Sequence, residues 1–85
     1  MNHPEVGREL KADELKAKTI VVIRAEHRPD IAVTMWVKEV GDSIIWLYAG
    51  SGNVPVYLGL FRQLDGTLRD DAGHMIHVYE YLGKP

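Results

Sequence analysis

Residues 31–49, IAVTMWVKEVGDSIIWLYA, most constrain what this chain can fold into. Two runs rich in β-branched and aromatic residues flank Gly41 and Asp42, and such a Gly-Asp pair is typical of a two-residue type II′ hairpin turn. The register that follows pairs Val37 with Trp46 and Met35 with Tyr48 on one face, and places Trp36, Ile45 and Leu47 on the other. Both faces are then apolar, which predicts a hairpin covered on both sides, as in a small barrel or sandwich.

The chain has 85 residues, of which 46% are hydrophobic and 26% charged. This composition predicts one globular domain over residues 1–85, with residues 1–7 as a loose N-terminal arm because no periodic pattern begins there. No run approaches the roughly 18 apolar residues of a membrane span, and the N-terminal residues lack the apolar segment of a secretory signal. We therefore expect a cytoplasmic protein without a membrane partner.

The chain contains no cysteine and carries a formal net charge of −2. The lack of cysteine excludes disulfides, cysteine-zinc sites and a thiol nucleophile. The net charge lacks the basic excess that binding to a phosphate backbone usually requires. Nucleic acid is therefore not the expected partner, although a local basic patch could survive the average.

Local patterns place the elements that precede and follow the hairpin. Residues 8–18 are rich in helix formers and predict one or two helical turns, capped by Asp13, that plug an end of the β structure. Residues 19–25, TIVVIRA, lack alternation and predict a central strand buried on both faces. Residues 26–30 and the glycine-rich residues 50–53 are expected to be loops.

Further strands are predicted in the C-terminal half. Residues 54–63 alternate in polarity, with Pro55 placing the start of the strand at an edge or a bulge and Gly59 permitting a bend. A three-residue loop at residues 64–66, with its glycine in the left-handed conformation, leads to a short strand. Residues 74–82 are expected to form the last strand.

Five or six short strands joined by tight turns favour a mostly β fold, built as a small antiparallel barrel with a short N-terminal helical turn. This architecture resembles the SH3-like barrels. The resemblance concerns the architecture alone, and such barrels host unrelated functions. The predicted core consists of Val21, Ile23, Val37, Trp46, Val56 and Leu58.

His74 and His77 are spaced so that they suggest a metal site, with Asp70, Asp71 or Glu80 as a third ligand. Positions three apart in a strand point to opposite faces, so we expect surface histidines and no metal. No serine-histidine or paired-carboxylate motif supports catalysis, and residues 50–53 lack the lysine and the following helix of a phosphate-binding loop. The prediction is a protein with no catalytic residue, no cofactor and no small-molecule substrate.

Aromatic and histidine side chains alternate along two of the C-terminal strands. They are Tyr57 and Phe61 on one strand, and His77, Tyr79 and Tyr81 on the other. If the strands are neighbours, their rings meet, either as a packed second side of the barrel or as an exposed strip of the kind that protein interfaces select. Base stacking would use the same rings but needs more basic residues than Arg62 and Arg69.

These patterns predict a non-enzymatic binding or assembly module that acts through protein–protein contacts of those five side chains. The partner is another protein or a second copy of the chain. We expect a twofold homodimer joined through side chains and not through a continuous sheet, because Pro55 blunts the strand edge. The side chains of this contact would be Tyr57, Phe61, Tyr79 and Tyr81. Two alternatives stay open: a small barrel that binds single-stranded nucleic acid and, with less support, a small metal-dependent or hydrolytic enzyme.

Overall fold

The computed structural model describes residues 6–51 and 54–83, in which strands dominate. The elements, in chain order, are β1 (Val6–Leu10), the 3₁₀ turn η1 (Ala12–Glu14), β2 (Ile20–Ala25), β3 (Val33–Val40), β4 (Ile44–Ser51), β5 (Val54–Arg62), β6 (Leu68–Arg69) and β7 (Met75–Tyr81).

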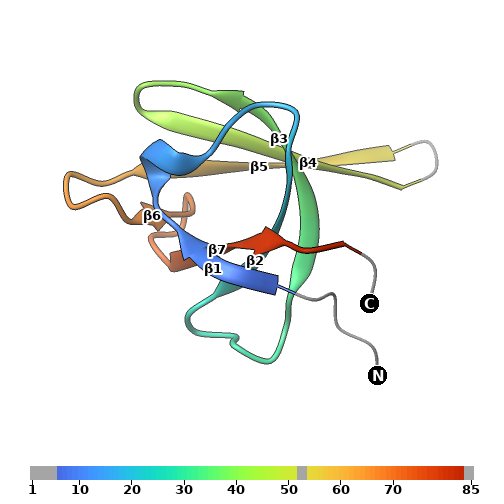
Figure 1. The fold of residues 1–85 in the computed structure, drawn as a ribbon. Helices are drawn as coiled ribbons and strands as arrows, with labels where there is room; N and C mark the ends of the chain where they lie inside the picture. The colour runs from blue at the N-terminus through green and yellow to red at the C-terminus, as the bar shows by residue number, and fades with distance from the viewer. Residues whose placement is uncertain (1–5, 52–53, 84–85) are drawn as a thin grey trace.

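All strands belong to one antiparallel sheet with the order β1-β7-β2-β3-β4-β5-β6. The sheet closes on itself because β6 also pairs with β7, through Leu68 opposite Ile76 and Arg69 opposite Met75. Six strands therefore form a small barrel, and β1 is added outside the closed ring along β7 (Figure 1). The predicted fold class is confirmed, and the arrangement is consistent with an SH3-like barrel.

β2 is the central strand that its sequence predicts. It pairs with β3 on one side and with β7 on the other. Val21, Val22 and Ile23 are consecutive and all buried, so both faces of the strand are covered. An unbroken run of β-branched side chains is stable only in such a position, because each face must lose its contact with water.

The N-terminal segment differs from its prediction. Val6 and Gly7, expected in a loose arm, begin β1, and the rest of that arm lies outside the described residues. Helix formers up to Leu10 extend as a strand because β7 offers a free edge there, with Leu10 opposite Val78, and pairing outweighs weak helix propensity.

A single helical turn does follow, and it plugs the barrel as expected. Ala12 and Leu15 are buried in the core. The cap is not Asp13: the turn starts after Lys11, whose backbone N–H donates to the Glu14 carboxylate at 2.8 Å.

The β3–β4 hairpin has a different register from the predicted one. The backbone N–H of Gly41 donates to the carbonyl of Ile44 at 2.9 Å, so Asp42 and Ser43 form the two-residue loop, one position later than expected. A bulge between Val37 and Glu39 then places Val37 opposite Leu47. The later turn alone would keep Trp46 on the face of Val37. The extra residue of the bulge shifts the register by one position and turns Trp46 and Tyr48 to the outside and Ile45 and Leu47 to the inside.

The core shows the effect of that shift. Val21, Ile23 and Val37 are buried as predicted, and Leu58 is half-buried at the margin. Trp46 was expected inside but points outward and is 41% exposed, while Ile45 and Leu47 take the inner positions.

Val56 was also wrongly assigned to the core, since it is 57% exposed. It faces Ala49 in the distal part of the β4–β5 hairpin, beyond Tyr48, the last residue of β4 that pairs with β3. This part of the hairpin extends past the barrel in Figure 1; Ala49 still packs against the margin of the core, but Val56 is not among the core residues. Gly50 and Ser51, predicted to lie in a loop at residues 50–53, belong to β4 instead; residues 52 and 53 lie outside the described residues.

The β5–β6 connection agrees with its prediction. Gly66 has a φ of 89°, a conformation that favours glycine, and its N–H donates to Gln63. The N–H of Gln63 donates to Thr67 at 2.9 Å, which defines the three-residue loop at residues 64–66. The Asp65 carboxylate accepts from the backbone and the hydroxyl of Thr67 and fixes the turn.

Candidate interaction surface

Five aromatic side chains share the outer face of three neighbouring strands, and we call them the aromatic strip. They are Trp36 on β3, Trp46 and Tyr48 on β4, and Tyr57 and Phe61 on β5. The register brings them together: Trp36 lies opposite Tyr48, and Tyr48 lies opposite Tyr57. The rings of Tyr48 and Tyr57 are tilted, with centroids 6.2 Å apart.

Most of the strip is open to water. Trp36 and Trp46 are each 41% exposed, Tyr57 is 53% exposed and Phe61 38%. Single exposed apolar residues are normal on a protein surface, but large rings gathered on adjacent strands are not. The arrangement therefore marks this face as a candidate contact surface.

Two lysines lie beside the part of the strip formed by Trp36, Tyr48 and Tyr57. The ammonium of Lys38, the extra residue of the β3 bulge, lies 5.0 Å from the ring centroid of Tyr57, in cation–π geometry. Lys18 and Lys38 line a hollow of about 270 Å³ together with Trp36, Val37 and Tyr48. A partner with acidic groups or an electron-rich edge would find both a ring and a cation here.

The structure divides the five side chains predicted as the contact set. Tyr57 and Phe61 belong to the aromatic strip. His77, Tyr79 and Tyr81 lie on β7, which does not pair with β5, because β6 separates the two strands. The two strands are not neighbours, so the condition under which their rings would meet is not fulfilled.

The β7 side chains have partners within the chain. The guanidinium of Arg24 lies 5.6 Å from the ring centroid of Tyr79, and Tyr81 lies opposite Val6 of β1. Sequence reasoning missed Trp46 and Tyr48 because the bulge reverses the faces of β4, and it left Trp36 out of the contact set although the predicted register already placed it on the face opposite to that of Val37. One signal was present: a glycine such as Gly59 within a strand indicates a close neighbour, here the Trp46 ring.

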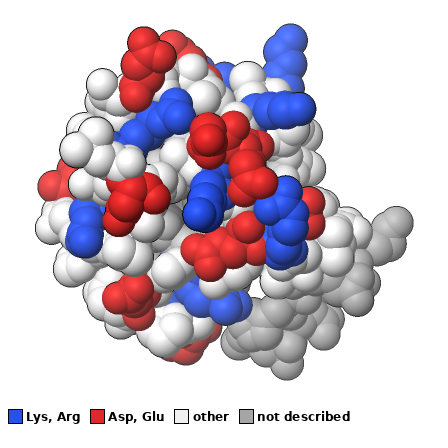
Figure 2. Space-filling view, turned by 60° about the vertical axis from the view of Figure 1, so that its left-hand side comes forward, with Lys and Arg blue, Asp and Glu red and all other residues white. Residues whose placement is uncertain are grey.

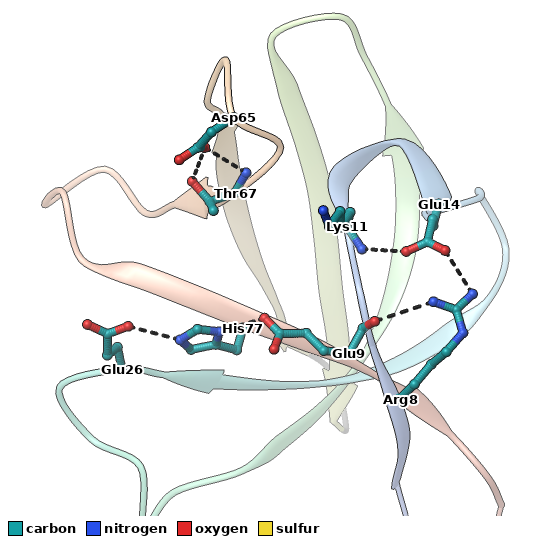
Figure 3. A network of polar contacts seen from close by, with 8 residues as sticks. All are labelled: Arg8, Glu9, Lys11, Glu14, Glu26, Asp65, Thr67 and His77. Carbon is teal, nitrogen blue, oxygen red and sulfur yellow. Dashed lines mark hydrogen bonds and ion pairs between the residues drawn. The ribbon is translucent and has the colours of Figure 1, made fainter.

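His77 lies between two carboxylates from different parts of the chain (Figure 3). Its Nδ1 is 2.6 Å from Glu9 of β1, and its Nε2 is 3.1 Å from Glu26, which follows β2. Both nitrogens donate only in the imidazolium form. The hydrogen bond with Glu9, with a smaller contribution from Glu26, raises the pKa of His77 despite partial burial.

A second polar cluster joins β1 to η1. The Arg8 guanidinium lies 2.8 Å from Glu14, and this contact, with the Lys11 backbone N–H, lowers the pKa of the Glu14 carboxylate (Figure 3). The His77 cluster ties β1 to the barrel, and the Arg8–Glu14 cluster ties β1 to η1.

His74 and His77 do not converge on one point. His74 stacks on His27, with ring centroids 3.8 Å apart, while His77 contacts the two glutamates. Within residues 6–51 and 54–83, no group of three or more His, Cys, Asp or Glu side chains has the geometry to hold a metal ion.

Charge is mixed on the face seen in Figure 2, where Lys and Arg side chains alternate with Asp and Glu. That face has no broad basic area of the kind that tracks a phosphate backbone. Nor does the described part of the chain contain a helix that could cross a bilayer, since its helical segment is the three-residue η1.

The fold and the strip together define a small closed antiparallel β-barrel with an exposed aromatic face. Comparisons with protein-family models, curated sequences and solved structures give no significant match.

Proposed function

We propose that this chain is a non-enzymatic binding or assembly module, working in the cytoplasm, that acts through protein–protein contacts of the aromatic strip. The observation that carries the proposal is the set of large rings, from Trp36 to Phe61, held exposed on adjacent strands of a closed barrel. Tryptophan and tyrosine dominate the energy of protein interfaces, because they bury much area with few rotatable bonds.

The rigidity of the supporting strands favours this use. Val37, Leu47 and Leu60 lie directly beneath the strip and are fully or almost fully buried. Rings that project from such strands lose little conformational freedom on binding, which reduces the entropic cost of association.

The test is affinity capture from the native host, comparing the wild-type chain with Trp36→Ala. Trp36 lies on the outer face, so its loss should leave the barrel folded while removing a central contact. Val33→Ala is the matched control, because Val33 is also 41% exposed on β3 but outside the strip. We expect a protein that is retained by the wild type and Val33→Ala and reduced about tenfold or more by Trp36→Ala. Equal retention by all three would overturn the proposal.

A second candidate function is binding of single-stranded nucleic acid. Lys18 and Lys38 beside the rings of Trp36, Tyr48 and Tyr57 favour it, because stacked bases need a nearby cation. The net charge of −2 counts against it. Binding of oligonucleotides that weakens steeply with salt, and that is lost in a Lys18→Glu/Lys38→Glu double variant, would favour this candidate over a protein partner.

A further inference from the structure

One side of β5 is open over most of its length. β5 pairs with β4 from Val54 to Phe61, but β6 covers its other side only at Phe61 and Arg62. Within the described part of the chain, no strand pairs with residues 54–60 on that side. An open edge of this length is a template for another strand.

The hydrogen-bonding groups on this edge follow from the ladder. The N–H of Arg62 donates to Ser43 at 2.9 Å, so Arg62 points its backbone groups toward β4. Alternate residues of an antiparallel strand point the same way, so Tyr57 and Gly59 direct their N–H and carbonyl groups outward. Pro55 adds a carbonyl but has no N–H to offer.

Residues 54–60 themselves carry none of the charges that usually protect such strands; the Lys38 ammonium of β3 lies over the outer face of the Tyr57 ring. Residues 54–60 read VPVYLGL, and Val54 and Val56 are 70% and 57% exposed. Natural edges are commonly blunted by lysines, bulges or very short strands, whereas here only Pro55 serves that purpose. A long uncharged apolar edge is more consistent with an interface than with a free surface.

The same stretch is complementary to itself about Tyr57. When two copies are set antiparallel with Tyr57 opposite its counterpart, the outward N–H and carbonyl of each Tyr57 meet those of the other. The pairs that follow are Val56 with Leu58, Pro55 with Gly59 and Val54 with Leu60. The free stretch is used from end to end, and the register stops where β6 begins.

Proline fits this register. Pro55 meets Gly59, whose N–H donates to the Pro55 carbonyl, and the pyrrolidine ring then stands on the face of the sheet that Trp46 covers. The Trp46 ring lies over Gly59 and would contact that ring. From this symmetry and the lack of charge we infer that a second copy of this chain docks on the β5 edge, in a twofold dimer with a continuous sheet.

This inference goes beyond the proposed function, because it concerns the open edge of β5 and not the partner of the aromatic strip. It replaces the expected contact through Tyr79 and Tyr81, which lie on β7. The paired stretch is short beside the roughly 20–30 residues a side of a standard interface. We therefore expect a reversible dimer with a dissociation constant in the micromolar range.

Single-cysteine variants test the register, because the chain has no cysteine of its own. Tyr57→Cys places two thiols on the twofold axis, where facing Cα atoms of a ladder lie about 5.5 Å apart, within disulfide range. We expect Tyr57→Cys to form covalent dimers under mild oxidation, and Val33→Cys on β3 to stay monomeric. Faster cross-linking of Leu58→Cys than of Tyr57→Cys would overturn the register, and equal cross-linking of Val33→Cys would overturn the site.

Light scattering and hydrogen exchange test the dimer without cross-links. We expect the wild type to dimerise at high concentration, with protection of the Tyr57 and Gly59 amides that rises with concentration. Val56→Lys should weaken the dimer at least about tenfold, and Val33→Lys should not. A monomer at millimolar concentration overturns the inference, as does a dimer insensitive to Val56→Lys. If a different captured protein is lost with Val56→Lys while the wild type stays monomeric, the edge serves that protein and not a second copy.

The two proposals fail separately. Trp36→Ala reports on the aromatic strip through partner capture and should leave the dimer mass unchanged. Val56→Lys reports on the edge through that mass.

Discussion

The indole ring of Trp46 lies across Gly59 on the outside of the barrel, so close that a Cβ at Gly59 would stand 3.0 Å from the ring. The two residues face each other across the β4–β5 ladder. A large ring over a glycine covers backbone that would otherwise be exposed, and it fixes the position of the ring within the aromatic strip.

We predict that Gly59→Ala displaces the Trp46 ring while changing the free energy of unfolding by less than about 1 kcal/mol. The ring is half-exposed, so a Cβ at position 59 can push it toward solvent at little cost, and alanine offsets part of that cost by stiffening the strand. The measurement is tryptophan fluorescence in a Trp36→Phe background, which leaves Trp46 as the one emitter. Gly50→Ala is the control, because its Cβ would meet only Tyr48, at an ordinary 3.9 Å. Unchanged emission in Gly59→Ala would contradict the contact.

The register of the β3–β4 hairpin predicts the order of two neighbouring alanine variants. Leu47 is fully buried, so Leu47→Ala should cost about 2–5 kcal/mol. Trp46 is 41% exposed, so Trp46→Ala should cost only about 1–2 kcal/mol. Denaturant titrations of both variants decide the matter. A larger loss of unfolding free energy for Trp46→Ala than for Leu47→Ala would contradict this register and favour the one predicted from the turn residues, in which Trp46 pairs with Val37 inside the barrel.

His77 predicts a stability that depends on pH. Its pKa is raised above 6.5 in the folded state, chiefly by the hydrogen bond to Glu9 and then by Glu26. The stabilisation is therefore fully present below pH 6.5 and is lost as the pH rises through the raised value. Arg24 lies opposite His77 on the neighbouring strand β2, and its positive charge disfavours the imidazolium. The pKa of His77 is nevertheless raised, so the dependence of stability on pH remains.

The measurement compares urea titrations of the wild type and His77→Gln at pH values on both sides of 6.5. The variant should lose most of the decline in stability with rising pH. His74→Gln is the control, because the His74 ring stacks on His27; only its backbone N–H, which the substitution keeps, donates to a carboxylate, that of Asp70. An equal slope in the wild type and His77→Gln would rule out the bridge as its source.

Lys18 predicts a stabilising substitution. Its φ of 71° lies in the left-handed region, where a side chain costs about 1 kcal/mol and glycine does not. Lys18→Gly should therefore raise the free energy of unfolding by about 0.5–1 kcal/mol, despite the added freedom of the unfolded chain. Lys16→Gly, nearby and without a positive φ, should bring no gain. Thermal unfolding of the two variants provides the comparison.

The sequence predicts those elements whose conformation is set by their own residues, and it fails for those set by pairing with a distant strand. β2 and the loop at residues 64–66 are predictable, because an unbroken β-branched run and a glycine after Asp65 each specify one conformation. β1 is not, because its strand form comes from pairing with β7 and not from its own helix-forming residues.

The candidate surface was only half predictable for a related reason. Tyr57 and Phe61 lie on a strand whose alternation is undisturbed, so their outward face could be read directly. The outward position of Trp46 depends on a single extra residue, Lys38, at the β3 bulge. No residue preference in the sequence near Lys38 predicts a bulge there. One such insertion decides whether a tryptophan enters the core or the surface.

The position of β2 in the sheet has a consequence for how the chain folds. β3 lies beside it early in the chain, but its other neighbour, β7, is the last strand of the described chain. The most buried strand therefore gains its second partner only after a long loop has closed, and such non-local pairing is slow, on the order of milliseconds to seconds. Until then the run from Val21 to Ile23 stays partly open to water. We expect the β2–β5 meander to form first and to need protection from aggregation until β7 arrives.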